Sequence, residues 1–303
     1  MEKKVMVGYD GSDRSEDALA LGRSLADVMD ARLIVAGVIH SNPMIVHFDP
    51  SYGEEDPELT DRVLRASAVV AGDAETIVGA SAASGLHLMA EKERADLIVV
   101  GSSHRGRVGR VMVGSTAHRL LHGAPCPVAV APVGWRGHTD AGLRSIAVGY
   151  DGSPEAQVAL DQAVELAKQE GAGIRIAMVA EPPPLVYGKG GGATQGYHEL
   201  EKAIEEELRG QLRNAVAATS ETGVEVEGEL LSGDAASKLA EVASKADLMI
   251  VGSRGYGPLR CVLLGSVSVA LLDSCPSPVL VCARGSVQTD TMLDTRQVLS
   301  ARG

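Results

Sequence analysis

The stretch GSRGYGPLRCVLLGS, residues 252–266, spaces its glycines as G-x2-G-x9-G and sets a serine directly after the last one. Apolar residues 246–251 lead into it as a strand, and residues 267–272 leave it with helical spacing. This order outlines a phosphate site, because glycines let backbone N–H groups turn toward an anion and a helix N-terminus adds further unpaired N–H groups. We expect Ser266 to cap the helix or to donate its hydroxyl to a phosphate. Glycines alone favour a plain flexible loop.

A second copy of the stretch strengthens the phosphate interpretation. It lies at residues 99–115, where Gly101 and Gly114 precede Gly252 and Gly265 by the same 151 positions. The sequence YDGS at residues 9–12 likewise returns at residues 150–153. A period this long indicates a domain duplication rather than a solenoid. We predict domains at residues 1–138 and 139–285, with a polar linker at 134–143 and a polar tail at 286–303.

The composition argues against several classes of function. The 303 residues carry a formal net charge of −12 and only 3% aromatic side chains, which disfavours nucleic-acid and anionic-membrane binding. No apolar stretch reaches the roughly 18 residues of a membrane span. Residues 1–4 run straight into a strand without a signal segment, so we expect a cytoplasmic protein. The cysteines form no C-x-x-C pair and are expected to be small buried hydrophobes. They are Cys126, Cys261, Cys275 and Cys282.

Strand patterns alternate with helical ones along both halves, which predicts a parallel α/β sheet with right-handed crossovers. The expected strands of the first half lie at residues 5–10, 33–39, 76–79, 95–100 and 127–132. Those of the second half lie at 145–150, 174–179, 224–231, 248–251 and 278–282. Helices are expected between them, among them a charged one at 199–220, whereas residues 41–59 and 181–196 are expected to be loops. In such sheets, ligands sit beyond the carboxyl ends of the strands, where the strand order reverses.

The chain resembles the universal stress protein family in its tandem two-domain form. The resemblance rests on Asp10 and Asp151 after each first strand, on the loop at 252–266, on the ADLIVV run at 95–100 and on the Pro-Cys-Pro-Val segment around Cys126. It implies two open five-stranded parallel sheets of order 3-2-1-4-5, with helices on both faces, paired through their last strands. One branch of the family binds ATP at this loop, so the resemblance implies ATP as the cofactor, with Mg²⁺ carried by the phosphates.

Several residues are candidates for nucleotide binding under this resemblance. Asp10 and Asp151 match a position that contacts the nucleoside, although an Asp-Gly-Ser sequence equally favours an Asx-turn or a helix cap. Val38 and Val179 match a position whose backbone holds the adenine edge, although plain core valines explain them as well. The other candidates lie in the loops and turns: Gly11, Gly101, Ser103, His104, Gly106, Gly114, Ser115, Thr116, Gly152, Gly252, Arg254, Gly255, Gly257, Gly265, Ser266 and Val267.

The first half departs from the glycine pattern at His104, which stands where the second half has Gly255. If this position requires a positive φ, histidine is strained there and nucleotide binding by the first half is weakened. Alternatively its imidazole donates to a phosphate, or the residue does not touch the ligand. Both loops are basic, with three arginines in the first and two in the second, and guanidinium groups suit phosphates as well as solvent.

No catalytic signature is present: the sequence has no P-loop lysine, no nucleophile elbow and no H-E-x-x-H. The expected protein is therefore a regulator that holds an adenine nucleotide and at most hydrolyses it slowly, with an unidentified regulatory protein as its partner. Two rivals stay open, a stress adaptor that binds no nucleotide and an adenylating type of enzyme. The oligomeric state, including a homodimer, is also open.

Overall fold

A computed structural model describes residues 2–41, 56–103, 111, 114–138, 142–181, 193–253 and 266–282. The elements of the first half are β1 (Lys3–Gly8), α1 (Asp13–Met29), β2 (Ala31–His40), α3 (Pro57–Val69), β3 (Asp73–Gly79), α4 (Ala82–Glu93), β4 (Leu97–Gly101), α5 (Ser115–Leu120) and β5 (Val128–Ala131). A short 3₁₀ helix, η1 (Trp135–His138), follows. The second half consists of β6 (Ser145–Gly149), α6 (Pro154–Glu170), β7 (Gly173–Ala180), α7 (Ala193–Ser220), β8 (Val226–Ser232), α8 (Ala235–Ala243), β9 (Leu248–Gly252), α9 (Ser266–Leu272) and β10 (Val279–Cys282).

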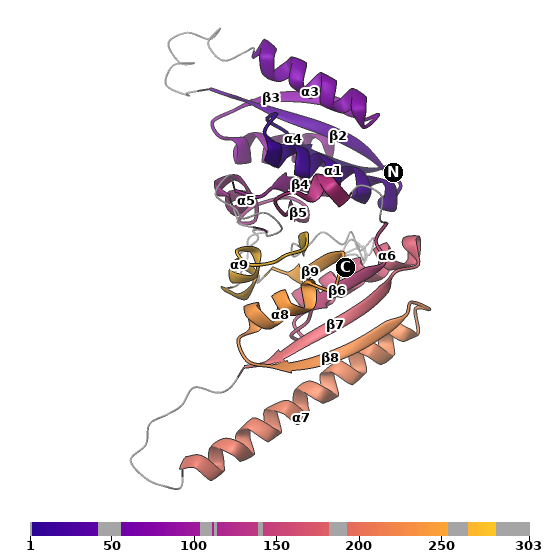
Figure 1. The fold of residues 1–303 in the computed structure, drawn as a ribbon, viewed down its shortest axis with the longest axis vertical. Helices are drawn as coiled ribbons and strands as arrows, with labels where there is room; N and C mark the ends of the chain where they lie inside the picture. Colours follow the sequence, from indigo (N-terminus) through magenta and orange to yellow (C-terminus); the bar gives the residue numbers. More distant parts are fainter. Residues whose placement is uncertain are drawn as a thin grey trace, which may run out of the picture.

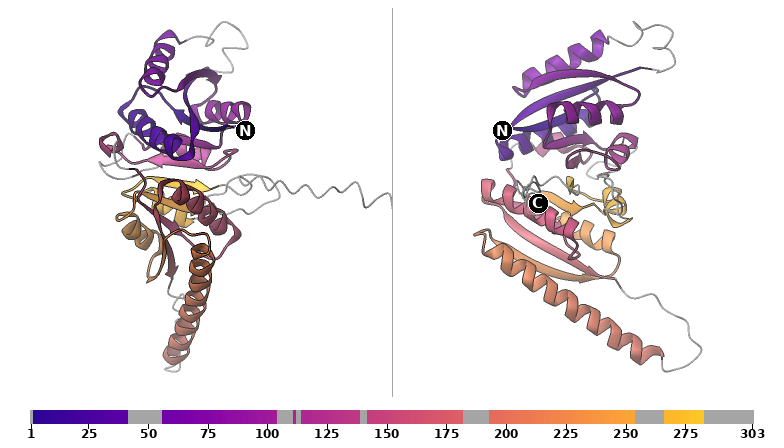
Figure 2. Two further views of the ribbon diagram at one scale, coloured as in Figure 1. Left: turned by 90° about the vertical axis from the view of Figure 1, so that its right-hand side faces the viewer. Right: turned by 180° about the vertical axis from the view of Figure 1, so that it is seen from behind.

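The two halves form one continuous sheet along the long axis of the molecule (Figure 1). Its strand order is β3-β2-β1-β4-β5-β10-β9-β6-β7-β8, so each half has the predicted order 3-2-1-4-5. The last strands meet in the middle, where Ala129 pairs with Leu280 in an antiparallel ladder (Figure 2). The predicted pairing of the halves is confirmed, and it covers the two inner sheet edges that would otherwise present unpaired backbone groups.

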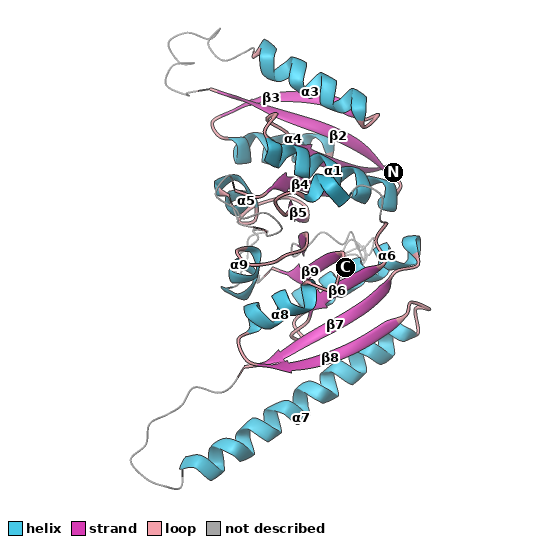
Figure 3. Cartoon of the chain, viewed as in Figure 1, coloured by secondary structure: helices cyan, strands magenta, loops and turns pink. Residues whose placement is uncertain are grey.

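Helices cover both faces of the sheet (Figure 3). Successive side chains of a strand point to opposite faces, so Val5 and Val7 belong to the core beneath α1, α3, α6 and α7, whereas Met6 belongs to the core beneath α4, α5, α8 and α9. The nearly continuous apolar strands are therefore buried on both sides, as in other parallel sheets. At the two ends of the sheet, α3 lies against β3 and α7 lies against β8.

Three predicted boundaries were wrong. The helix expected from about residue 60 begins at Pro57, because Asp56 caps it by accepting from the backbone N–H of Leu59 at 2.9 Å. The strand expected from residue 76 begins at Asp73, which is in register with Ile34 of β2. The loop expected at 181–196 ends earlier, because α7 begins at Ala193. The rest of that loop, residues 42–55 and the tail lie outside the described residues.

The prediction that the cysteines are small buried hydrophobes is confirmed for Cys126, Cys275 and Cys282, which are free and buried. Cys261 lies outside the described residues. Throughout the described ranges, no helix is long and apolar enough to cross a membrane.

Candidate functional site

Each half has a cavity at the carboxyl ends of its central strands, about 250 Å³ in the first half and about 230 Å³ in the second. The walls come from equivalent elements: the ends of the first, second and fourth strands and the starts of the helices that follow the first, third and fourth strands. The first cavity is lined among others by Tyr9, Asp10, Ser12, Arg14, Val38, His40, Ala82, Gly101, Ser103, Gly114, Ser115 and Thr116. The second is lined among others by Tyr150, Asp151, Ser153, Glu155, Val179, Glu181, Ala235, Gly252, Ser253, Val267 and Ser268.

The strand ends leave backbone groups facing each cavity. The ladder between β1 and β2 ends at Gly8 and Ala36, but β2 runs on to His40 beside β3. The carbonyl of Ala36 accepts from the backbone N–H of Tyr9 at 2.9 Å, so the N–H and C=O of Ala36 point toward β1. Alternation along a parallel strand then points the N–H and C=O of Val38 the same way, into the cavity beyond the end of β1.

The second half repeats this geometry. The carbonyl of Ala177 accepts from the N–H of Tyr150 at 2.9 Å, and the ladder with β6 ends there. The backbone of Val179 therefore faces the second cavity. Both valine side chains are half-buried and pack with the helices on one face. The two interpretations of Val38 and Val179 are thus compatible, because the side chain packs while the backbone faces the cavity.

Asp10 and Asp151 form Asx-turns at the cavity rims. The Oδ1 of Asp10 accepts from the backbone N–H of Ser12 at 2.9 Å, and that of Asp151 accepts from Ser153 at 3.0 Å. Each turn delivers the serine that caps the next helix. Both carboxylates are also exposed on the cavity walls. Turn formation and ligand contact are therefore not exclusive.

Gly11 and Gly152 lie next to these aspartates but not on the cavity walls. Their φ angles of 81° and 76° fall in the left-handed region, which glycine adopts without strain. Gly11 and Gly152 therefore allow the tight turn between strand and helix.

Gly101 and Gly252 line the cavities, and a close approach of backbone explains why both are glycine. A Cβ on Gly101 would lie 2.1 Å from the carbonyl oxygen of Arg14 in the first turn of α1. A Cβ on Gly252 would lie 2.5 Å from the carbonyl oxygen of Glu155 in the first turn of α6. The absent side chains allow a helix start to dock on the end of the central strand, which shapes each cavity.

The candidate residues around Gly114 lie together at the start of α5. Gly114 is the N-cap with φ −81°, an ordinary angle for any residue. Ser115 is the first helical residue, and Thr116 lines the cavity beside it. In the second half, α9 begins at Ser266. Both expected roles of its hydroxyl, helix capping and donation to a phosphate, stay predictions.

The remaining loop candidates lie outside the described residues: His104, Gly106, Arg254, Gly255, Gly257 and Gly265. The structure thus brings together the strand-end candidates, Ser103 and the start of the last helix.

A buried hydroxyl distinguishes the second cavity. In the first half, Ser102 donates its hydroxyl to the carbonyl of Ala131 at 2.6 Å. The equivalent Ser253 is only 1% exposed and lines the second cavity, yet its Oγ has no hydrogen-bond partner among the described residues. A buried polar atom without a partner is costly, so such an atom on a cavity wall is suited to a ligand. Sequence reasoning missed it, because a serine between a strand and a glycine-rich loop carries no signal of burial.

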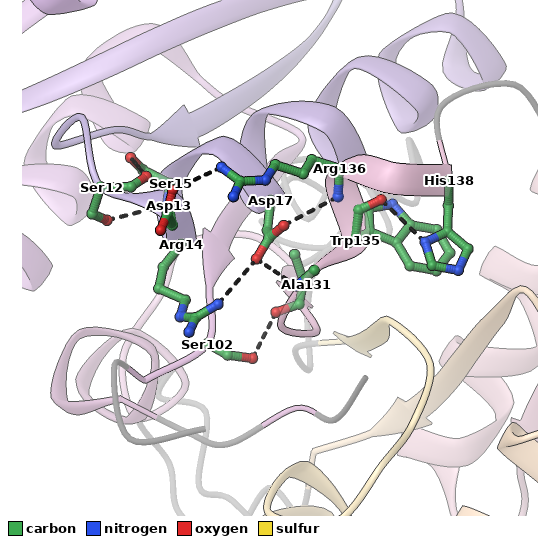
Figure 4. Close-up of polar contacts among 11 residues, drawn as sticks. Ser12, Asp13, Arg14, Ser15, Asp17, Ser102, Ala131, Trp135, Arg136 and His138 are labelled. Carbon is green, nitrogen blue, oxygen red and sulfur yellow. Dashed lines mark hydrogen bonds and ion pairs between the residues drawn. The ribbon is translucent and has the colours of Figure 1, made fainter. Parts of the chain in front are cut away.

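Arg14 is held at the mouth of the first cavity by a buried carboxylate (Figure 4). Its guanidinium lies 3.5 Å from Asp17, which is 1% exposed. Asp17 also accepts from the backbone N–H groups of Gly134 at 2.8 Å and Arg136 at 3.1 Å. The predicted linker is therefore tied to α1 where it leaves β5. These contacts span more than a hundred residues, so no local pattern could predict them.

Two tyrosines stand beside the cavities with raised pKa values. Burial, together with the carboxylate of Glu16 to which the Tyr9 hydroxyl donates, raises the pKa of Tyr9 well above its usual range. Burial also raises the pKa of Tyr150, helped by Asp151 and Asp161. Both phenols therefore stay protonated near neutral pH and serve as neutral wall groups.

Burial similarly raises the pKa of the Cys126, Cys275 and Cys282 thiols to about 12. A nucleophilic cysteine needs its thiolate, so these three are structural. Within the described part of the chain, no group of three or more His, Cys, Asp or Glu side chains is placed to hold a metal ion.

Known proteins resemble this chain in both sequence and fold. A model of the universal stress protein family matches residues 1–132 and again residues 142–283. A universal stress protein of Mycobacterium tuberculosis (strain H37Rv) is 29% identical over 297 residues, covering 91% of this chain and 96% of the relative. A second one from the same strain is 27% identical over 293 residues, covering 91% and 98%.

Solved structures share the tandem fold. The crystal structure of a universal stress protein from Archaeoglobus fulgidus covers 93% of this chain and 98% of its own, with a TM-score of 0.61 at 24% identity. One of a putative universal stress protein from Pseudomonas aeruginosa covers 93% of both chains, with a TM-score of 0.62 at 17% identity. At these identities the likeness concerns the fold.

Proposed function

The chain belongs to the universal stress protein family, and on this basis we propose that it is a regulatory protein that holds an adenine nucleotide, with ATP as the first candidate, in the cavity of each half. The observation that carries the proposal is the pair of equivalent cavities at the reversal of strand order. Each has a stretch of strand backbone beyond the end of the first strand at one side and the first residues of the half's last helix at the other.

The wall groups fit the parts of a nucleotide. The N–H and C=O of Val38 offer a donor and an acceptor in one plane, which matches the donor and acceptor edge of an adenine. The carboxylate of Asp10 can accept from a ribose hydroxyl. The hydroxyls of Ser115 and Thr116, together with the backbone at Gly114, are donors for phosphate oxygens.

The second cavity offers the same backbone at Val179 and the same carboxylate at Asp151, and the partnerless hydroxyl of Ser253 adds a donor. A bound nucleotide would stabilise the folded protein through its binding energy, and its presence or absence would be the regulatory signal. Mg²⁺ would enter on its phosphates, the usual way in which this ion reaches a nucleotide site.

A regulatory role is favoured over catalysis. The described parts of the cavity walls combine aspartates already engaged in Asx-turns, protonated tyrosines and hydroxyls. Covalent catalysis would need a nucleophile activated by an adjacent base. Walls of this kind hold phosphates rather than activating a water, so we expect hydrolysis to be slow or absent. The proposed output is a change in the surface presented to a protein partner when nucleotide is bound.

Mass analysis of small molecules released on denaturation tests this function, followed by calorimetric titration of the emptied protein with ATP in the presence and absence of Mg²⁺. We expect a released adenine nucleotide or saturable ATP binding. Ala82→Trp and Ala235→Trp each add an indole to one cavity wall and should each remove one site. If the emptied protein binds neither ATP nor adenosine, the protein is instead a stress adaptor that acts through protein contacts without a nucleotide.

A further inference from the structure

Two equivalent serines, Ser102 and Ser253, use their hydroxyl groups differently. Each directly follows a central strand, and each backbone N–H donates to the end of the neighbouring strand: Ser102 to Ala131 at 3.1 Å, and Ser253 to Cys282 at 3.0 Å. The Ser102 hydroxyl donates to the same carbonyl of Ala131 at 2.6 Å (Figure 4). Among the described residues, the Ser253 hydroxyl has no partner and does not make the matching bond to Cys282.

Burial makes this difference important. Ser253 is 1% exposed and lies on the wall of the second cavity, so its hydroxyl is nearly closed to solvent on every side but that one. A buried donor without a partner lowers the stability of the folded protein. Native proteins seldom leave such a donor unmet, and one that faces a cavity is placed to meet a ligand.

The surroundings of Ser253 indicate which part of a ligand it meets. Ser268, in the first turn of α9, is also buried and donates its hydroxyl to the carbonyl of Gly252 at 3.3 Å. The first cavity has the apolar Ala117 at the equivalent place. Ser253 therefore lies where the end of β9 meets the start of α9, which is the phosphate end of the proposed site. Phosphate oxygens accept hydrogen bonds, so a donor without a partner suits them.

Other hydroxyls of the cavity walls differ in the opposite sense, because two positions have a hydroxyl only in the first cavity. The pairs are Ser15 and Ala156, and Thr116 and Val267. The two cavities therefore place their hydroxyls at different points, and neither is simply the richer. In the second cavity they gather at the strand end, on Ser253 and Ser268.

We propose that Ser253 is a specificity residue of the second cavity: its hydroxyl donates to a phosphate oxygen of the bound adenine nucleotide and so separates nucleotides from nucleosides. The inference rests on the proposed function and assigns a phosphate-bearing ligand to this cavity, because adenosine leaves the donor unmet. The unpaired hydroxyl destabilises the ligand-free protein, and a bound nucleotide removes that penalty. Ser102 has no such role, because its hydroxyl is already engaged by Ala131.

Calorimetric titration of Ser253→Ala with ATP, AMP and adenosine tests the assignment, in the Ala82→Trp background that leaves only the second cavity open. We expect ATP and AMP to bind at least about tenfold more weakly than to the Ala82→Trp parent, because a hydrogen bond to a charged group is lost. Adenosine binding should not change. Ser220→Ala is the matched control, because it removes an exposed hydroxyl at the end of α7 and should change no affinity.

Thermal unfolding of the ligand-free protein provides a second, independent measurement. Ser253→Ala should raise Tm by about 2–4 °C, because the unpaired donor is removed. Ser102→Ala should lower Tm by a similar amount, because it breaks a buried hydrogen bond. A serine that only supports the fold would not combine a gain in stability with a loss of nucleotide affinity.

Three results would contradict the phosphate contact of Ser253. Nucleotide binding that Ser253→Ala leaves unchanged, or that falls no more than adenosine binding, would overturn it while leaving the proposed function intact. A fall in Tm as large as that of Ser102→Ala would also overturn it, because the hydroxyl would then have a partner in the absence of ligand. If the Ala82→Trp protein binds neither ATP nor adenosine, the proposed function itself fails for this cavity, and the contact with it.

Discussion

Gly101→Ala should destabilise the protein and deform the first cavity. The added Cβ would lie 2.1 Å from the carbonyl oxygen of Arg14 and 2.6 Å from its carbonyl carbon. Both are backbone atoms, so no side-chain rotation relieves the clash. Either β4 or the first turn of α1 must move by about 1 Å. Overpacking of this kind costs typically 1–3 kcal/mol, and we expect about 3 kcal/mol because the obstacle is backbone.

Urea denaturation followed by circular dichroism measures this loss, and thermal unfolding should show a fall in Tm of about 6–12 °C. Gly123→Ala is the matched control, because a Cβ there meets nothing within 4 Å. It should change the free energy of unfolding by less than about 0.5 kcal/mol. The moved helix start should also weaken ligand binding in the first cavity. If Gly101→Ala unfolds at the same urea concentration as wild type, the close approach of α1 to β4 is not real.

Three further variants or treatments test separate parts of the molecule. Gly114→Val should fold normally, because a Cβ there would meet only Ser103 at an ordinary 3.5 Å and φ is −81°, but titration should find no nucleotide in the first cavity; unchanged affinity would remove this position from the site. Asp17→Ala should lower the free energy of unfolding by about 3 kcal/mol, because two backbone N–H groups of the linker lose their buried, charged acceptor. Asp17→Asn, which keeps one acceptor oxygen, should lose about half as much, and equal stability of all three proteins in urea would refute the anchoring role. In a Cys261→Ser variant, native protein should show no thiol reactive toward a disulfide reagent at pH 8, because burial holds the pKa of the other three near 12; labelling before unfolding would contradict their burial.

Much of the fold could be predicted because its signals are local or repeated. Near-continuous apolar strands between helical patterns indicate a parallel sheet, and the duplicated YDGS and glycine patterns set the two halves in register. The errors lie where tertiary contacts override propensity. Asp73 joins β3 because Ile34 lies beside it, and Asp56 starts α3 inside a segment rich in proline.

The site was predictable only where a motif marks it. The strand-end residues follow from the position of the strand order reversal, which the alternating pattern locates. The places of Arg14 and Glu155 on the cavity walls went unnoticed, because these residues lie outside the glycine pattern and look like ordinary surface charges in the first turn of a helix. The glycines at 101 and 252 suggested phosphate contact, whereas the geometry explains them through helix packing.

Photo-crosslinking with an azido-adenine analogue of ATP, mapped by peptide mass analysis, tests the central claim most directly. We expect labelling at residues 36–40 and at residues 177–181, both prevented by excess unlabelled ATP. The strand ends should be labelled because the backbone of Val38 and Val179 faces the proposed adenine positions. Label that excess ATP does not displace, or label confined to surfaces such as α3 and α7, would contradict an adenine site at the strand ends.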